Sequence, residues 1–327
     1  MAVISLGEKV KFIESVFGCG RLSGNSKNMD VWCPICAPKD ASKKKLAILM
    51  DDDRNHCWTC GWKARTLAPL IRKFGSREKF QEYINRFVPE AERAKQRAVP
   101  MPGNEVLRLP DGFRLLANAN KVIPDVKAAY RYVTSRGLDD DDLWYFKLGI
   151  ASELRWQRRI IVPSFDSEGD LNYYVARAID PRTRPKYDQP DVDSNPIVFN
   201  EINVDWKKRL VLCEGAFDMF KCGQNAVPLL GSDVSESSRL FNQILVNETP
   251  IAIALDDDMW ETKTIRMAKK FSDYDIDVVI VDTRKIGDPG NATKKEFRDA
   301  LKEAKPNTWL SMFMTRLNRA SKTSLVV

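Results

Sequence analysis

Acidic residues in the C-terminal half of the chain follow short apolar runs, a spacing suited to metal-ion chemistry. Glu214 and Asp218 lie in LCEGAFDMF, Asp256 and Asp258 in IALDDDMW, and Asp288 in KIGDPGNAT. Alternation along an extended chain puts the two carboxylates of Asp256-x-Asp258 on one side. Carboxylates that converge repel one another unless divalent cations neutralise them. We therefore predict a magnesium site, with solvated surface loops as the alternative.

Basic residues precede these carboxylates along the chain. Arg159 opens RIIVP, Arg177 lies in YVARAI and Lys186 lies in PKY. Cations bind triphosphates and a template backbone, while metal ions activate a hydroxyl nucleophile and stabilise leaving pyrophosphate. Together the two sets indicate nucleotidyl transfer, although an isolated surface Arg or Lys is common.

Four cysteines near the N-terminus have the spacing of a zinc site. They form CPIC (Cys33 and Cys36) and CWTC (Cys57 and Cys60), with twenty residues between the two pairs. Each CxxC lets two thiolates reach one ion from a tight turn, and a hairpin returns the second pair. We predict one structural Zn²⁺ held by four cysteines. His56, the only histidine in the chain, is the alternative fourth ligand.

Aromatic and basic residues surround the zinc ligands. Trp58 and Trp62 occur with Arg54 and Lys63. Stacking faces mixed with cations bind single-stranded nucleic acid, so we predict a DNA-binding face here. The alternative is that the zinc only stabilises a small domain and the tryptophans cover the metal.

The elements that must position these residues follow from the pattern of apolar runs. From Arg209 onward, short apolar strands alternate with amphipathic helices, which predicts a parallel sheet with helices on its faces. Its carboxyl edge is where ligands bind in such folds. The preceding stretch mixes a helix at 125–138 with β-rich runs at 158–165 and 171–179. The predicted organisation is a zinc ribbon (1–75), a helix and linker (76–104), a basic α+β subdomain (105–200), a catalytic α/β subdomain (201–305) and a C-terminal helix and tail (306–327).

Composition sets limits on the kind of protein. The chain has 327 residues, 43% of them hydrophobic and 30% charged, and a formal charge of +7. The longest apolar runs are shorter than a membrane span and the N-terminus does not look like a signal peptide, so we expect a cytoplasmic, multidomain protein without a membrane partner. The net charge fits an anionic partner without requiring one.

These motifs together resemble the DnaG-type DNA primases of bacteria and phages over nearly the whole chain. Arg159-Ile-Ile-Val-Pro163 with Ala176-Arg177, and Pro185-Lys186-Tyr187, are similar to the basic motifs of that family. Glu214-Gly215 with Asp218, Asp256-x-Asp258 and Asp288-Pro289 are similar to its topoisomerase-primase (toprim) motifs. Gly290 stands where some members have a further acidic residue, and Pro196 where lysine is frequent.

The resemblance implies a function and its participants. Catalytic Mg²⁺ or Mn²⁺ would be bound by Glu214, Asp256, Asp258 and Asp288, with Asp218 as a further catalytic carboxylate. Arg159, Arg177 and Lys186 would bind template or nucleotide. The activity implied is RNA primer synthesis on single-stranded DNA from ribonucleoside triphosphates, giving an RNA–DNA hybrid. No GxxxxGKS/T loop occurs in the sequence, so we expect no helicase motor in the chain itself. The resemblance to small primases that work beside a separate hexameric helicase implies such a helicase as partner, with single-strand-binding protein as another.

The layout is most similar to the small primases of tailed bacteriophages, which would place the chain in the cytoplasm of a host cell. Two rivals remain. A RecR-like recombination mediator also joins a four-cysteine zinc element to a toprim fold, but lacks the basic subdomain between them. A toprim nuclease or topoisomerase would use the same carboxylates to cut DNA. The C-terminal Trp309, Leu310, Phe313 and Leu317 either pack on the catalytic subdomain or bind the helicase.

Overall fold

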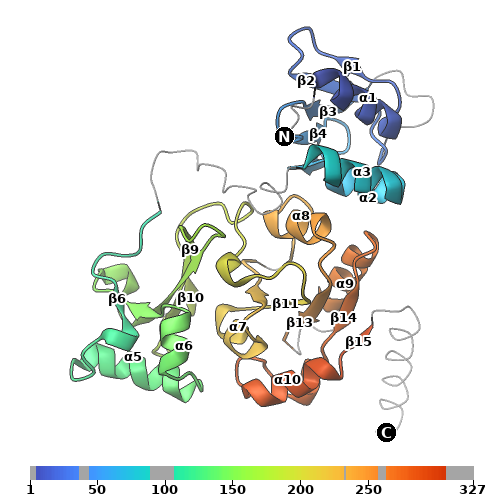
Figure 1. Ribbon diagram of the computed structural model, residues 1–327. Helices are drawn as coiled ribbons and strands as arrows, with labels where there is room; N and C mark the ends of the chain where they lie inside the picture. Colours follow the sequence, from blue (N-terminus) through green and yellow to red (C-terminus); the bar gives the residue numbers. More distant parts are fainter. Residues whose placement is uncertain (1–4, 37–43, 89–106, 232, 257–262, 307–327) are drawn as a thin grey trace, which may run out of the picture. The chain divides into compact units, whose positions relative to one another are not determined.

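The structure is a computed structural model, and its elements are labelled in Figure 1. It describes residues 5–36, 44–88, 107–231, 233–256 and 263–306. The predictions for Asp258, for the linker before residue 105 and for the helix after residue 306 fall outside these ranges. The chain forms two compact units, the first made of residues 1–97, 234–249 and 273–276 and the second of the remainder.

An antiparallel sheet of short strands carries the cysteine pairs of the first unit. Its order is β1-β2-β3-β4-β5, so each strand pairs with the next along the chain. The strands are β1 (Arg21–Leu22), β2 (Asn28–Val31), β3 (Leu46–Leu49), β4 (Asn55–Cys57) and β5 (Lys63–Ala64). This succession of hairpins agrees with the predicted zinc ribbon.

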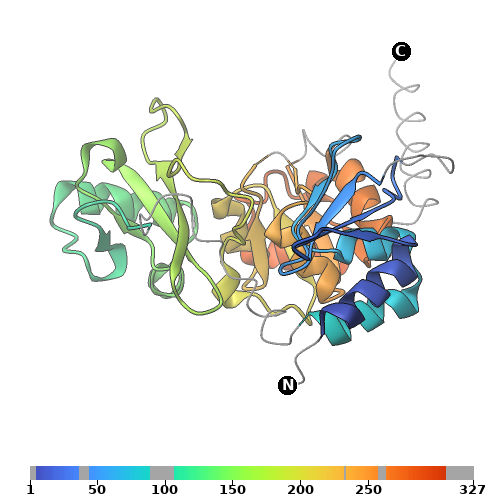
Figure 2. The same ribbon diagram turned by 90° about the horizontal axis from the view of Figure 1, so that it is seen from above.

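Three helices of the first unit pack on this sheet: α1 (Leu6–Phe17), α2 (Ala68–Phe74) and α3 (Arg77–Phe87). Figure 2 shows the strands on one side of the unit and these helices on the other. The helix predicted from Ser76 is α3, and its first turn is capped because the Ser76 hydroxyl accepts a hydrogen bond from the backbone N–H of Lys79. A shared apolar core between the layers includes Phe12, Ile13, Leu46, Ile48, Leu70, Ile71 and Phe80.

The first unit also contains α8 (Arg239–Val246) and the segment 273–276, which come much later in the chain. The side chain of Arg72 on α2 is 5% exposed and makes an ion pair with Glu248 at 2.8 Å. Its Nε donates a hydrogen bond to the carbonyl of Tyr274 at 2.8 Å. Val246 of α8 joins the apolar core of the unit. A set of long-range contacts therefore closes the unit around its N-terminal part.

The second unit begins with an antiparallel sheet of order β10-β9-β8-β7-β6. Its strands are β6 (Arg114–Leu115), β7 (Gly149–Ile150), β8 (Arg159–Phe165), β9 (Leu171–Ala178) and β10 (Tyr187–Asp188). The runs predicted as strands at 158–165 and 171–179 are β8 and β9, which pair from Arg159 opposite Ala178 onward. The predicted helix at 125–138 is α5 (Pro124–Ser135), followed by α6 (Asp140–Tyr145).

A second sheet of this unit has the order β12-β11-β13-β14-β15. Its first four members are parallel and β15 pairs antiparallel at the edge. The strands are β11 (Leu210–Cys213), β12 (Ala226–Pro228), β13 (Ile251–Ala254), β14 (Val278–Ile280) and β15 (Lys305–Pro306). β11, β12 and β13 are buried throughout, as expected for strands covered on both faces.

Helices cover the faces of the parallel strands: α7 (Ala216–Cys222), α9 (Ile265–Ser272) and α10 (Lys294–Lys302). α7 and α10 share a core with alternate strand residues, among them Val211, Cys213, Ala252 and Ala254. Since α7 and α9 lead to neighbouring strands in opposite directions across the sheet, right-handed crossovers put them on opposite faces. The alternating α/β pattern expected from the sequence is confirmed.

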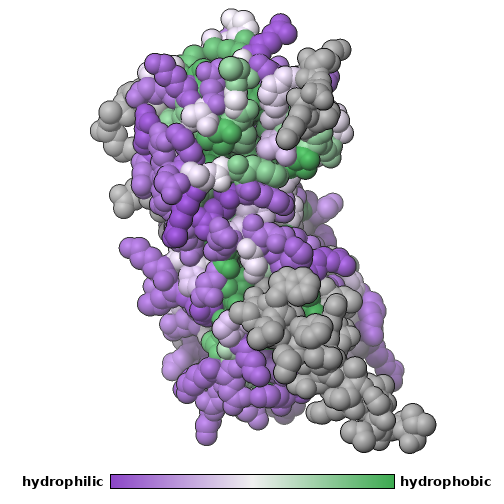
Figure 3. All heavy atoms as spheres, turned by 90° about the vertical axis from the view of Figure 1, so that its right-hand side faces the viewer, coloured by the Kyte–Doolittle hydropathy of each residue, from purple (hydrophilic) through white to green (hydrophobic). Residues whose placement is uncertain are grey.

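The surface of the described residues has both hydrophilic and hydrophobic regions. On the face drawn in Figure 3 the second unit is mostly hydrophilic, while hydrophobic colour is more extensive over the first unit. Large exposed apolar side chains of the first unit are Leu6, Ile35, Trp58 and Phe74. Within the described ranges, no helix combines the length and the apolar character needed to cross a membrane.

Candidate functional site

Three predicted carboxylates meet at the carboxyl edge of the parallel strands. Oxygen atoms of Asp218, Asp256 and Asp288 lie within 4.8 Å of one another. Asp256 follows β13 by two residues, and Asp288 comes from the loop after β14. The two loops are tied together because the Thr283 hydroxyl donates a hydrogen bond to the carbonyl of Leu255 at 2.8 Å. Oxygens that share one octahedral Mg²⁺ lie about 3 to 4 Å apart, so small side-chain shifts fit the cluster to an ion.

Asp218 lies deepest in this cluster, in the first turn of α7. The backbone N–H of Gly215 donates a hydrogen bond to its Oδ2 at 2.7 Å. Burial raises the pKa of Asp218 to about 7, and the charges of Asp256, Asp288 and Glu214 add to this effect. A carboxyl group in this position is partly protonated at neutral pH and ionises fully when a cation binds beside it.

Glu214 is the remaining described carboxylate of the predicted set. It follows the last residue of β11 directly and is close enough for its charge to raise the pKa of Asp218. Its Oε2 is buried and, within the described residues, has no hydrogen-bond partner. A buried carboxylate oxygen without a donor is costly, whereas a metal ion would satisfy it. The donor set therefore fits the expected divalent cation.

Gly290 is packed against the cluster so closely that a side chain would not fit. A Cβ atom there would overlap Oδ1 of Asp218 and would lie 3.1 Å from Oδ1 of Asp288 and 3.0 Å from Nη2 of Arg136. The backbone of Gly290 is thus enclosed by two carboxylates and a guanidinium group.

Arg136 is a candidate site residue that the sequence interpretation missed. It follows α5 directly, donates a hydrogen bond to Asn291 and lies 5.9 Å from the ring centre of Phe217. Its Nε is buried without a hydrogen-bond partner in the described part of the chain. The available signal was its place at the end of the predicted helix at 125–138, because a helix end can present a side chain to a neighbouring sheet edge.

Arg177 lies beside the same helix that carries Asp218. Its guanidinium stacks 4.7 Å from the ring centre of Tyr187 and 5.7 Å from that of Phe217. Its Nε donates a hydrogen bond to the hydroxyl of Tyr132 at 2.9 Å. Stacking on aromatic rings holds the guanidinium plane while leaving some of its donors for a ligand.

The other two predicted cations differ in exposure. Arg159 is only 4% exposed, and its Nη1 donates a hydrogen bond to the carbonyl of Pro185 at 2.9 Å. Lys186, the next residue, is exposed. Through this hydrogen bond, Arg159 holds the backbone of the residue before Lys186. Direct contact of Arg159 or Lys186 with template or nucleotide stays a prediction.

The cysteine cluster of the first unit fits a tetrahedral zinc ion. All four Sγ atoms lie within 4.8 Å of one another, and His56 is not among the cluster. Sγ of Cys33 is 3.9 Å from Cys60, and Sγ of Cys36 is 3.6 Å from Cys57. Zn–S bonds of about 2.3 Å in a tetrahedron separate sulfurs by about 3.8 Å, between the two observed values.

The environment of Cys57 favours a thiolate. Burial raises the pKa of this thiol, but hydrogen bonds from the backbone N–H groups of Cys60 and Thr59 and from the side chains of Cys36 and Cys60 together outweigh burial and bring it to about 7. Thr59 N lies 3.5 Å from the Cys57 sulfur. Since zinc binds thiolates rather than thiols, these N–H groups prepare the ligand.

The residues predicted to bind DNA around the zinc cluster do not share one environment. Trp58 is 72% exposed and its ring centre lies 4.3 Å from that of His56. Lys63 is also exposed. Trp62 instead packs against the core and donates a hydrogen bond from Nε1 to Asn55 at 2.9 Å. Arg54 makes an exposed ion pair with Asp52 at 2.6 Å.

No protein-family model matches the chain. No curated protein matches its sequence. The structure is similar to the crystal structure of the zinc-binding and RNA polymerase domains of the Aquifex aeolicus primase, with a TM-score of 0.51 and 17% identity. That similarity covers 98% of this chain and 91% of the other. At this identity, what the two chains demonstrably share is the fold.

Two further solved structures match part of the chain. One is a DnaG primase catalytic domain bound to single-stranded DNA, with a TM-score of 0.45 and 19% identity over 60% of this chain and 76% of that one. The other is the RNA polymerase domain of Mycobacterium tuberculosis DnaG, with a TM-score of 0.46 and 16% identity over 62% and 82%. Each of these two structures is of a DnaG primase.

Proposed function

We propose that the chain is a DNA primase that synthesises short RNA primers on single-stranded DNA. The observation that carries the proposal is the cluster of Asp218, Asp256 and Asp288 with Arg136 and Arg177 close to α7. Cations beside a metal-binding cluster suit a triphosphate substrate better than either feature alone. The primase-like fold along the chain supports the same function.

The described residues have distinct roles in this proposal. Asp218, Asp256, Asp288 and Glu214 hold divalent cations, Mg²⁺ or Mn²⁺, at the sheet edge. Bound there, such ions would activate the primer 3′-hydroxyl and would stabilise the leaving pyrophosphate. Arg136 and Arg177 bind the phosphates of the incoming ribonucleotide or of the template. The exposed side chain of Lys186 contacts the sugar–phosphate backbone of the template DNA.

The first unit acts as the template-binding part in this account. Trp58 offers an exposed ring for a base, and Lys63 offers a cation for the backbone. The zinc ion keeps the hairpins that present these side chains in place. The cytoplasm is the proposed location because thiols stay reduced there and available for zinc. A separate hexameric helicase, single-strand-binding protein and an RNA–DNA hybrid product belong to the same proposal.

One assay separates this function from its rivals. The full chain is incubated with single-stranded DNA, ribonucleoside triphosphates and Mg²⁺, and the products are resolved on a denaturing gel. New short RNA that requires all three components is the expected result. Strand breaks without RNA would instead identify a nuclease or topoisomerase, and DNA binding without either product would identify a recombination mediator.

A further inference from the structure

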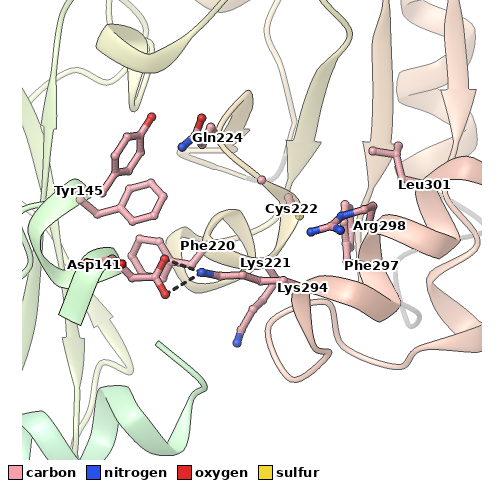
Figure 4. A pocket seen from close by; sticks show the side chains of 13 residues that line it. Asp141, Tyr145, Phe220, Lys221, Cys222, Gln224, Lys294, Phe297, Arg298 and Leu301 are labelled. Atoms are coloured by element: carbon pink, nitrogen blue, oxygen red, sulfur yellow. Dashed lines mark hydrogen bonds and ion pairs between the residues drawn. The ribbon is translucent and has the colours of Figure 1, made fainter. Parts of the chain in front are cut away.

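A surface groove of about 500 Å³ lies in the second unit between α6, the end of α7 and α10 (Figure 4). Its lining includes Tyr145, Phe220, Lys221, Gln224 and Arg298. None of the carboxylates or cations of the candidate functional site lines this groove. Its volume is within the range of pockets that hold one small organic molecule, roughly 300 to 1,000 Å³.

Aromatic rings give the groove an apolar base with one accessible ring. Phe146, Phe220 and Phe297 are buried, whereas Tyr145 is 37% exposed. The Tyr145 ring packs edge-on against the ring of Phe146, with 4.8 Å between the two ring centres. This contact fixes the position of the Tyr145 ring at the side of the groove. An exposed, positioned ring is a stacking surface for a flat heteroaromatic group.

Positive charge exceeds negative charge along the lining. Lys221, Lys294 and Arg298 face Asp141 and Asp142. Lys294 and Asp142 neutralise each other, since the ammonium lies 2.6 and 2.8 Å from the two carboxylate oxygens. Arg298 is exposed, and in the described part of the chain it has neither an ion pair nor a hydrogen bond. Figure 4 places Arg298 and Tyr145 on opposite sides of the groove.

Lys221 is a buried cation that its surroundings satisfy poorly. The residue is 6% exposed, and among the described residues its ammonium donates one hydrogen bond, to the carbonyl of Gly137 at 3.2 Å. Burial lowers its pKa, and the nearby Lys294 lowers it further. Burying an ammonium with a single neutral acceptor costs free energy, which an anion bound in the groove would offset.

We propose that this groove is a binding site for a free nucleoside 5′-phosphate, separate from the polymerisation site. The base stacks on Tyr145, and the phosphate binds Arg298, while Lys221 adds positive charge to the lining. A flat ring joined to a phosphate matches one aromatic face and an excess of cations better than a purely apolar ligand does. No chemical step is involved, and the site does not depend on the polymerase activity proposed above.

Binding of AMP to the full chain tests this site. Isothermal titration calorimetry is run on zinc-loaded protein without added divalent cation, so that the acidic cluster repels the phosphate. One AMP per chain is expected, with adenosine binding more weakly because it lacks the phosphate. Arg298→Ala should weaken AMP binding about tenfold or more, the usual effect of losing a charge-assisted contact to phosphate.

The controls separate a ligand contact from general effects of charge or folding. Lys295→Ala removes an exposed cation from the same helix that does not line the groove, and should leave AMP binding unchanged. Lys221→Met keeps most of the buried stem and should weaken binding without lowering the melting temperature. Asp256→Asn should bind AMP as the wild type does.

Three outcomes would overturn the proposal. The first is absence of saturable AMP binding by the wild type up to millimolar concentrations. The second is equal AMP affinity in the wild type and Arg298→Ala. The third is a short single-stranded oligonucleotide that binds in an Arg298-dependent way while AMP does not, because the groove would then take a nucleic-acid strand instead.

Discussion

At the scale of single residues, the candidate functional site is a cluster of carboxylates packed close to the guanidinium group of Arg136. The sequence placed Glu214, Asp218, Asp256 and Asp288 after apolar strands, and parallel strands bring such positions to one edge. It did not reveal Arg136, which comes from a helix outside the parallel sheet and reaches the cluster only through the packing of two subdomains. A sequence shows which residues follow the strands of one sheet. It does not show which residues of a separate sheet or its helices lie close to them in the folded chain.

The pH dependence of stability follows from Asp218. Its pKa in the folded chain is about 7 and its ordinary value is 3.8, so between these values the folded state binds more protons than the unfolded state. Stability should therefore fall as pH rises from about 4 to about 7 and then level off, by an amount on the order of 4 kcal/mol. Urea unfolding of magnesium-free protein across this range measures it.

Asp218→Asn is the matched variant for this prediction, since it keeps the shape and removes the titration. Its stability should change less between pH 4 and 7 than that of the wild type, and saturating Mg²⁺ should reduce the pH dependence of the wild type as well. Identical pH profiles for the wild type and the variant would contradict the assignment of the raised pKa.

A second prediction at this scale concerns Gly290. A methyl group at Gly290→Ala would press on Asp218 and Asp288 and displace Arg136, so Mg²⁺ affinity should drop about tenfold or more. Calorimetric titration with Mg²⁺ provides the measurement. Gly24→Ala, at an open position in the first unit, should bind Mg²⁺ normally; a normal affinity in Gly290→Ala would mean that the cluster is looser than described.

At the scale of elements, the sequence predicted the strands and helices with strong apolar patterns. β8, β9 and α5 coincide with the segments predicted at 158–165, 171–179 and 125–138, and α3 with the helix predicted from Ser76. After Arg209, strands β11 to β14 alternate with α7, α8 and α9, in agreement with the predicted alternation. The two-residue strands β1, β5, β6, β7, β10 and β15 were not predicted individually, because so short a strand has no periodicity of its own. Partners in the folded sheet, rather than local sequence, define them.

The zinc-binding sheet offers a prediction for a whole element. β3 and β4 are short, so the metal is expected to hold the hairpins together. Cys36→Ser should lose the bound zinc, which atomic absorption measures. The midpoint temperature of its first thermal unfolding transition should also be lower than that of the wild type. Cys19→Ser, an exposed cysteine outside the cluster, is the control and should retain one zinc per chain. Full zinc content in Cys36→Ser would refute a four-cysteine site.

At the scale of the whole molecule, contacts distant in sequence complicate simple deletions. Val246 of α8 packs in the core of the first unit, and Thr66 donates a hydrogen bond to Asn242 at 2.8 Å. Removing the zinc ribbon would expose these groups, so loss of activity in a truncated chain would not isolate template binding. The chain order of apolar segments gave no sign of this, because packing between elements 170 or more residues apart depends on the complete fold.

A point substitution therefore tests template binding better. Trp58→Ala removes an exposed ring and should weaken binding of single-stranded DNA about tenfold, since one stacked base contributes roughly 1 to 3 kcal/mol. Fluorescence anisotropy with a labelled oligonucleotide gives the affinity. Trp144→Ala, which removes an exposed tryptophan of the second unit, should bind normally. Equal affinities for both variants and the wild type would remove Trp58 from the template-binding face.

Primer synthesis by Asp256→Asn tests the central claim most directly. The substitution removes one charge from the acidic cluster and preserves the size of the side chain, whereas Asp299→Asn removes an exposed charge on α10 and serves as the control. We predict that Asp256→Asn makes at least about a hundredfold less RNA on single-stranded DNA, because the variant lacks a ligand of the metal that the reaction requires. Its affinity for DNA should stay the same, because the metal acts in the reaction and not in binding of the template. Asp299→Asn should match the wild type. A normal rate of primer synthesis by Asp256→Asn would contradict the account.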